Sequence, residues 1–147
     1  MSAHRETSTG FLLHAREFLL AAELVLNRAQ GVSLPAYFLF GRSVELSLKA
    51  FLLACGVTAK GLKTREFGHN LSALLKEAIT RGLHDYVPLA STEIGVLELL
   101  SYDYMEKRFE YRVTGGTYCL PLIDVTEQVA RKLVSGLEKF CADTTGS

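Results

Sequence analysis

The sequence predicts an all-α protein, an up-and-down bundle of four to five helices that forms a single domain over 1–147. Apolar residues recur at steps of three and four through most of the chain, which is the spacing of a helix face that packs into a core. Cap residues and glycines mark the expected helix ends. Apolar residues make up 48% of the chain, enough for a continuous core without disulfides or metals. We place that core at about 8–142 and expect mobile tails outside it.

The first two helices are predicted at 8–29 and 33–56. The first carries one apolar stripe and stops before Gly31, where a positive φ favours glycine. Ser33 is the expected N-cap of the second helix, and Pro35 lies in its first turn, where a missing N–H costs little. Apolar side chains surround the second helix in nearly every direction, so we expect it to be central and enclosed by its neighbours.

The periodic pattern fails at 58–67, which we interpret as a mobile or irregular connector. A short third helix should follow Asn70, a good N-cap, and end at Gly82. After Pro88, apolar spacing predicts a fourth helix at about 91–107.

Apolar and polar residues alternate on both sides of Gly115-Gly116, which indicates a short β-hairpin near 109–120. The last helix should begin at Asp124, because Glu127 three residues later completes an acidic variant of a capping box. We expect that helix to fray beyond position 142.

The composition limits the cellular compartments and the binding partners that we expect. Sixteen basic residues balance sixteen acidic ones, so no net charge draws the whole molecule to nucleic acid or to an anionic membrane. Three widely separated cysteines, Cys55, Cys119 and Cys141, match neither a disulfide framework nor a zinc site, and they predict a reduced, cytoplasmic protein. The apolar run 34–57 could reach across a bilayer, but its central charges argue for a buried helix and against a membrane span.

Those central charges, Arg42, Glu45 and Lys49, are the first candidate site. They lie within about 60° of one another on the second helix, which is otherwise built for burial. In one reading the stripe lines a groove in which Arg42 and Lys49 bind phosphate while Glu45 orients them or a ligand hydroxyl. In the other, Glu45 and Lys49 form an ion pair one turn apart and Arg42 bonds to a neighbouring helix or a dimer partner.

Two further groups are candidates for ligand binding. His69 precedes the cap Asn70, and its imidazole can bond to loop backbone or to a carboxylate such as Glu45. Tyr104, Arg108 and Arg112 belong to a segment in which rings alternate with cations; such a segment can stack bases and hold phosphates, or pack as aromatic core with arginine at its rim. The basic stretch 60–81 offers a weaker RNA surface or simple solubility. We find no metal-ligand spacing, no Gly-rich phosphate loop after a strand, and no cofactor motif.

Two runs of sequence resemble the HEPN family. The run Phe40-Gly-Arg-Ser-Val-Glu-Leu-Ser-Leu-Lys-Ala-Phe-Leu-Leu and the later Gly68-His-Asn-Leu-Ser-Ala-Leu-Leu are similar to the second and third HEPN helices. The segment Tyr102-Asp-Tyr-Met-Glu-Lys-Arg-Phe resembles the end of a later helix in some HEPN branches. The resemblance implies a bundle of four or five helices, homodimerisation, and nucleotide binding or RNA cleavage in toxin, antitoxin or phage-defence systems.

One feature of active HEPN ribonucleases is missing. Those proteins carry an arginine followed four to six residues later by histidine near the start of the final helix, whereas the last histidine of this chain is His84. We therefore expect a non-catalytic module, a homodimer or partner subunit, that recognises a nucleotide or RNA. The alternatives are a diverged ribonuclease toxin that uses Arg42, Glu45 and His69, and a structural adaptor that pairs with a nucleotidyltransferase-like protein.

Overall fold

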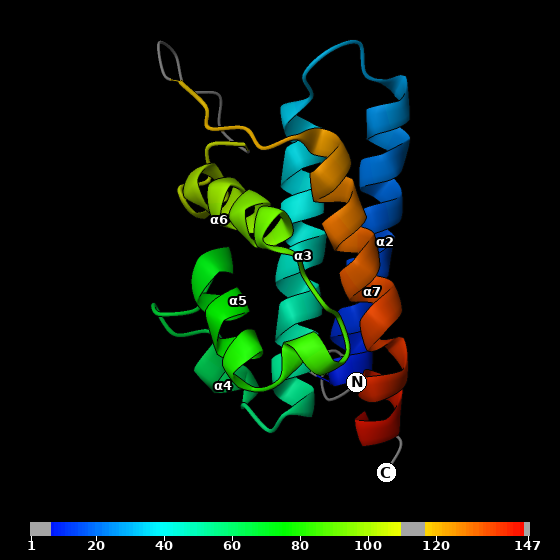
Figure 1. Ribbon diagram of the computed structural model, residues 1–147, viewed down its shortest axis with the longest axis vertical. Helices are drawn as coiled ribbons and strands as arrows, with labels where there is room; N and C mark the ends of the chain where they lie inside the picture. The colour runs from blue at the N-terminus through cyan, green and yellow to red at the C-terminus, as the bar shows by residue number, and fades with distance from the viewer. Residues whose placement is uncertain (1–6, 110–116, 146–147) are drawn as a thin grey trace.

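Three long helices form the body of the protein. The computed structural model describes residues 7–109 and 117–145, and among these the regular structure is entirely helical. The long helices α2 (Ser8–Arg28), α3 (Leu34–Ala54) and α7 (Ile123–Thr145) pack side by side along the long axis of the molecule (Figure 1). The helices α4 (Ala59–Leu62), α5 (Leu71–Thr80) and α6 (Ser91–Met105) lie on the other side of α3. The predicted all-α class is confirmed.

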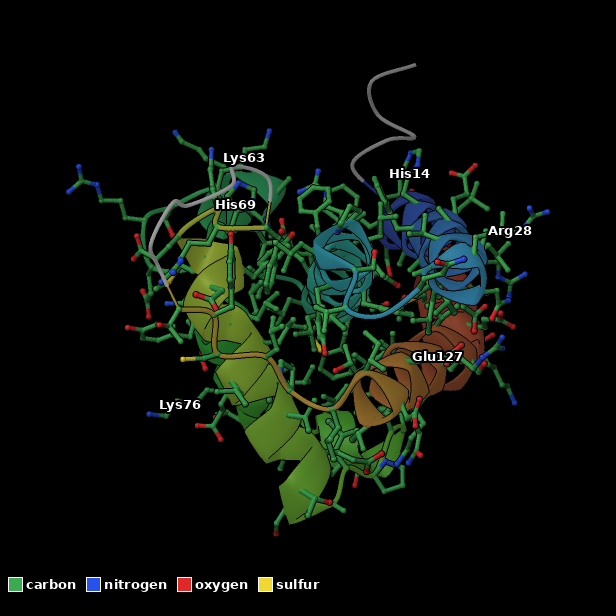
Figure 2. The ribbon with its side chains drawn as sticks, turned by 90° about the horizontal axis from the view of Figure 1, so that it is seen from above. His14, Arg28, Lys63, His69, Lys76 and Glu127 are labelled. Atoms are coloured by element: carbon green, nitrogen blue, oxygen red, sulfur yellow. The ribbon has the colours of Figure 1, made fainter. Side chains whose placement is uncertain are left out.

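The arrangement differs from a simple up-and-down bundle. Figure 1 shows α3 and α7 running in the same direction, and Figures 1 and 2 together show α6 lying across the long helices. After α5, a 3₁₀ turn (Leu83–Asp85) and the residues that follow carry the chain over to α7. There Tyr86 packs against Phe140, with ring centroids 4.4 Å apart. The chain then enters α6, which runs away from α7 (Figure 1).

The predicted ends of α2, α3 and α5 are close to the observed ones, because local capping determines them. The Ser33 hydroxyl accepts from Ala36 N at 3.2 Å, and the Asn70 side chain accepts from Ala73 N at 3.1 Å, so each caps its helix as predicted. Gly31, Gly56 and Gly82 have φ values of 93°, 102° and 96°, beyond the ends of their helices.

Three predicted details are wrong or lie outside the described residues. The connector 58–67 contains the short helix α4, capped by Thr58. The last helix begins at Ile123, so Asp124 lies inside its first turn and not at the N-cap, and the helix continues to Thr145. The centre of the predicted hairpin, 110–116, lies outside the described residues, and its described flanks, Phe109 and 117–120, form no strand.

The core surrounds α3, as the sequence predicts. Fourteen of its residues are buried, among them Phe40, Leu48 and Phe51. Small residues bring α2 and α3 together closely, so that hydroxyls of one helix reach backbone carbonyls of the other. Ser43 donates to Ala15 O at 2.7 Å, and Ser8 donates to Ala50 O at 2.8 Å. None of the helices formed by the described residues has the length and apolarity needed to cross a bilayer.

The contact between α7 and the 86–90 segment generates a stability prediction. A Cβ added at Gly136 would lie 2.7 Å from Val87 Cγ2 and 3.1 Å from Tyr86 O, whereas a Cβ at Gly95 of α6 meets nothing within 4 Å. Gly136→Ala should therefore lower the free energy of unfolding by about 1–3 kcal/mol, while Gly95→Ala should raise it by up to about 1 kcal/mol. Urea denaturation of both variants measures the difference. A Gly136→Ala variant as stable as the wild type would show that α7 and the 86–90 segment are not tightly packed against each other.

Candidate functional site

A buried carboxylate lies at the centre of the candidate site. Glu45 sits on α3, and only 1% of its surface is exposed. An ionised carboxylate in such a position is stable only if cations and hydrogen-bond donors surround it. The neighbours of Glu45 must therefore include cations and hydrogen-bond donors.

Four donors satisfy Glu45. Its Oε1 accepts from the Tyr104 hydroxyl at 2.6 Å and lies 3.0 Å from His69 Nδ1. Its Oε2 accepts from Lys49 Nζ at 2.8 Å and from an Arg42 guanidinium nitrogen at 3.3 Å. Burial opposes ionisation, but the Lys49 charge and the hydrogen bonds from Lys49, Tyr104 and His69 outweigh it and lower the pKa of Glu45. We call these five residues the Glu45 cluster.

Two members of the Glu45 cluster come from α3 itself. Arg42 lies three residues before Glu45 and Lys49 four residues after it, and both spacings put side chains on one face of a helix. The Lys49 side chain is largely buried, whereas a third of the Arg42 side chain is exposed, and its guanidinium lies 5.8 Å from the centre of the Phe18 ring of α2. The ion pair between Glu45 and Lys49 belongs to one of the two readings that the sequence left open. That reading gave Arg42 a partner on a neighbouring helix or in a second copy, whereas Arg42 bonds to Glu45 on its own helix.

His69 reaches the cluster from the connector between α4 and α5. The tight turn at Gly68, with φ 36°, and the cap at Asn70 fix the backbone on both sides of it. The side chain of His69 is 46% exposed (Figure 2). With Nδ1 facing the carboxylate, the tautomer that carries its proton on Nδ1 is favoured. This contact with Glu45 is one of the two alternatives that the sequence left open for His69.

Tyr104 comes from α6 and is the most deeply placed donor. Burial, followed by the charge of Glu45 and the hydrogen bond to it, raises the pKa of Tyr104, so the hydroxyl remains a donor. Its ring lies against Gly41 of α3, where an added Cβ would be 2.5 Å from the ring. Phe38 stacks on the same ring at 6.1 Å. Sequence reasoning missed Gly41, although a glycine one turn before a buried acid is a signal of close approach by another element.

Arg108 has a separate set of partners. Its Nε lies 3.2 Å from Oδ1 of the fully buried Asp103, it donates to Thr117 O at 2.7 Å, and its guanidinium lies 5.0 Å from the centre of the Tyr118 ring. Asp103 also accepts from Cys119 N at 2.6 Å. Arg108 and Asp103 therefore hold the 117–119 segment against the C-terminal end of α6. Arg112, the last predicted ligand residue, lies outside the described residues.

The Glu45 cluster can bind an anion more readily than it can transfer a proton. Glu45 already accepts from four side chains and is closed to solvent, so it has no free oxygen with which to act as a base on an external molecule. Arg42 and His69 are the members with substantial exposed surface. While bonded to Glu45, Arg42 can still donate outward from its other guanidinium N–H groups, whereas His69 presents Nε2 outward as an acceptor. Within the described residues no three or more His, Cys, Asp or Glu side chains form a group that could hold a metal ion.

Comparisons with other proteins add no constraint on this site. A scan against protein-family models, a search of curated proteins and a search of solved structures each found no match to this chain.

The lowered pKa of Glu45 gives a pH prediction. A carboxyl whose folded pKa lies below its usual value near 4.5 contributes stability that is present above that value and lost as pH falls through the folded pKa. Glu45→Gln should lower the free energy of unfolding at pH 7 by about 3 kcal/mol or more, because Lys49 loses its buried counter-charge. Below pH 4.5 the gap to the wild type should shrink.

Denaturant titrations from pH 7 down to pH 3 measure that gap. Glu127, whose pKa is raised by the hydrogen bond that its protonated carboxyl donates to Glu23, by burial and by the Glu23 charge, contributes with the opposite sign. Since Glu127 is present in both proteins, it cancels in the comparison. A gap that stays constant with pH would mean that Glu45 is not ionised in the folded protein.

Proposed function

We propose that this protein is a non-catalytic HEPN-like module that binds a nucleotide or RNA through its phosphate at the exposed edge of the Glu45 cluster. The observation that carries the proposal is the convergence of Arg42, Lys49 and His69 on one buried carboxylate. With Arg42 and Lys49 charged, the cluster keeps a net positive charge after Glu45 is subtracted. A phosphate is the anion that nucleotides and RNA share, and arginine is well suited to recognise it.

The neighbouring aromatic rings support a nucleotide over a simple inorganic anion. Phe18 beside Arg42 and Phe38 beside Tyr104 are both only partly buried, and such rings offer surfaces on which a base can stack. The resemblance of 40–53 and 68–75 to HEPN proteins points the same way, since these are the runs that contain Arg42, Glu45, Lys49 and His69.

Binding at this edge makes Arg42 and His69 the sensitive positions. ATP, GTP and a mixed-sequence single-stranded RNA should each be titrated while the unfolding temperature is measured, because a ligand at a hundred times its dissociation constant adds about 2.7 kcal/mol of stability. Arg42→Ala should weaken binding about tenfold or more, since it removes a donor to phosphate. His69→Ala should weaken it about fivefold, since it removes an acceptor for a ribose hydroxyl. Higher salt should weaken the binding of the wild type.

Arg81→Ala is the matched control. Arg81 is an exposed arginine that pairs with Glu77 on α5, away from the Glu45 cluster, and its loss should leave binding unchanged. Equal loss in Arg81→Ala and Arg42→Ala would mean that the contact is diffuse and the proposed site wrong. Cleavage of RNA in the presence of a metal chelator, lost in a folded His69→Ala variant, would favour the diverged ribonuclease. No response to any of the three ligands would favour the adaptor that pairs with a nucleotidyltransferase-like protein.

A further inference from the structure

A groove lies between α5 and α6. It encloses about 490 Å³, within the range of about 300–1,000 Å³ that small-molecule sites occupy. The buried Leu75 and the half-buried Ile79 and Ile94 supply its apolar surface. Two opposite charges at exposed positions also line it, Lys76 from α5 and Glu98 from α6. We call this site the α5–α6 groove.

The two charges of the groove are unpaired. Within residues 7–109 and 117–145, neither Lys76 nor Glu98 forms an ion pair, with the other or with a third residue. Glu77, next to Lys76 in the sequence, is already bonded to Arg81, so it does not neutralise the lysine. The groove therefore presents a free cation on one helix and a free anion on the other.

A hydrogen bond joins the two walls of the groove. Ser72 N of α5 donates to the Ser101 hydroxyl of α6 at 3.2 Å. Lys76 lies one turn after Ser72, and Glu98 lies one turn before Ser101. The backbone positions that carry the two charges are thus held in place before any ligand arrives, and binding has only their side chains to order.

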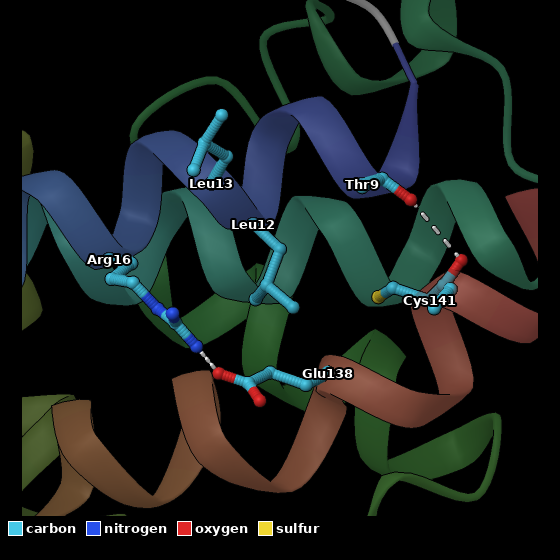
Figure 3. Close-up of a pocket in the computed structure, with 7 residues that line it drawn as sticks. Thr9, Leu12, Leu13, Arg16, Glu138 and Cys141 are labelled. Carbon is cyan, nitrogen blue, oxygen red and sulfur yellow. Dashed lines mark hydrogen bonds and ion pairs between the residues drawn. The ribbon is translucent and has the colours of Figure 1, made fainter.

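A smaller hollow between α2 and α7 shows the contrast (Figure 3). It encloses about 160 Å³, close to the roughly 150 Å³ of a cavity that holds one benzene molecule. Its charged residues, Arg16 and Glu138, are bonded to each other, and the Thr9 hydroxyl donates to the Cys141 carbonyl at 3.5 Å. The charges of this hollow are already satisfied, whereas those of the α5–α6 groove are not.

We propose that the α5–α6 groove binds a small aliphatic zwitterion. Such a molecule has one carboxylate, one ammonium group and an aliphatic body, as aliphatic amino acids and short aliphatic peptides do. The carboxylate of the ligand pairs with Lys76 and its ammonium pairs with Glu98, while the aliphatic body covers Ile79 and Ile94. Apolar contact holds the ligand in the groove, and the two charges select it.

The pair of opposite charges disfavours simpler ligands. An aliphatic acid would bring its carboxylate close to Glu98, and an aliphatic amine would bring its ammonium close to Lys76, so each would make one repulsive contact. An ion pair at an exposed side chain contributes little by itself. Selection therefore depends on both charges together, which a zwitterion alone satisfies.

Calorimetric titration of the full chain with L-leucine and with leucyl-leucine tests the ligand class and distinguishes its two sources. Lys76 and Glu98 belong to different helices and do not meet, so the dipeptide, whose charges are further apart, should bind about fivefold or more tighter than leucine. N-acetyl-leucyl-leucine lacks the ammonium and leucyl-leucine amide lacks the carboxylate. Each should bind about fivefold more weakly than the dipeptide. Tighter binding of leucine would still support the zwitterion and would assign the groove to free amino acids.

The isoleucines of the chain report where the ligand binds. There are three, Ile79, Ile94 and Ile123, so a methyl-labelled sample gives one δ1-methyl signal from each. Leucyl-leucine should shift the signals of Ile79 and Ile94, which line the groove. The signal of Ile123, at the start of α7, should stay in place.

Variants of the two charges test their roles. Lys76→Gln and Glu98→Gln should each weaken binding of leucyl-leucine about fivefold and keep the circular dichroism spectrum, because both side chains are exposed. Glu98→Gln should also bind the N-acetyl peptide as well as the free dipeptide, since the partner of the ammonium is gone. Lys139→Gln, at an exposed lysine of α7 outside the groove, is the control and should bind as the wild type does.

Arg42→Ala separates this proposal from the nucleotide site, because the α5–α6 groove and the Glu45 cluster share no residue. That variant should lose nucleotide binding and keep dipeptide binding, so failure of one proposal leaves the other standing. Absence of binding by both zwitterions at millimolar concentration overturns the zwitterion proposal. Analogues that bind as tightly as the dipeptide, or binding that Lys76→Gln and Glu98→Gln leave unchanged, overturn it as well.

Discussion

The structure depends on one unfavourable placement, an ionised glutamate inside the most enclosed helix of the protein. Removing a carboxylate from water costs several kcal/mol even after the surroundings relax, and partners from a single element rarely recover that cost. Glu45 obtains them from three places: Arg42 and Lys49 on its own helix, His69 on the connector, and Tyr104 on α6. Elements far apart in the sequence must therefore meet at this point if the chain is to fold.

This requirement explains why α6 can cross the bundle and still be held firmly. A crossing helix buries less surface against α3 than an aligned one, and apolar packing alone would define its position poorly. Two groups of hydrogen bonds, one near each end of α6, fix its position. Tyr104 bonds to Glu45 near the C-terminal end of α6, while Glu93 near its N-terminal end accepts from Ala90 N, Gln128 and Lys132. Hydrogen bonds fix direction where the hydrophobic contact does not.

The sequence predicts the parts of this arrangement that are local. Helix ends at Ser33 and Asn70 follow from side chains that cap their own backbone, and the pair formed by Glu45 and Lys49 follows from the helical repeat. The contact from His69 to Glu45 could be named from the sequence as one of two possibilities, because a buried acid needs a partner and a histidine beside a helix cap has few groups to bond to. In each case the partners are close in sequence or the choice of partner is small.

The parts that sequence reasoning missed are set by tertiary contacts. Nothing near Tyr104 indicates that its hydroxyl meets Glu45, and nothing near Arg108 indicates that its partners are Asp103 and Thr117. The direction of α6 depends on how the 86–90 segment passes Gly136, a contact between positions about fifty residues apart. The acidic start expected at Asp124 was also misplaced, since helical hydrogen bonding already begins with Thr126 N to Leu122 O, two residues earlier than a cap at Asp124 would allow.

The two faces of α2 differ in what they contact. Its inner face is held to α3 by close backbone approach, with hydroxyl bonds at Ser8 and Ser43, so the exposed leucines of its outer face, Leu13, Leu20 and Leu24, lie on a rigid support. The polar edge of the Glu45 cluster has the opposite character, since Arg42 and His69 are anchored at one end by a shared carboxylate and solvated at the other. The proposed anion would find the guanidinium of Arg42 already oriented, so the group that α3 needs in order to bury Glu45 would also serve the proposed binding.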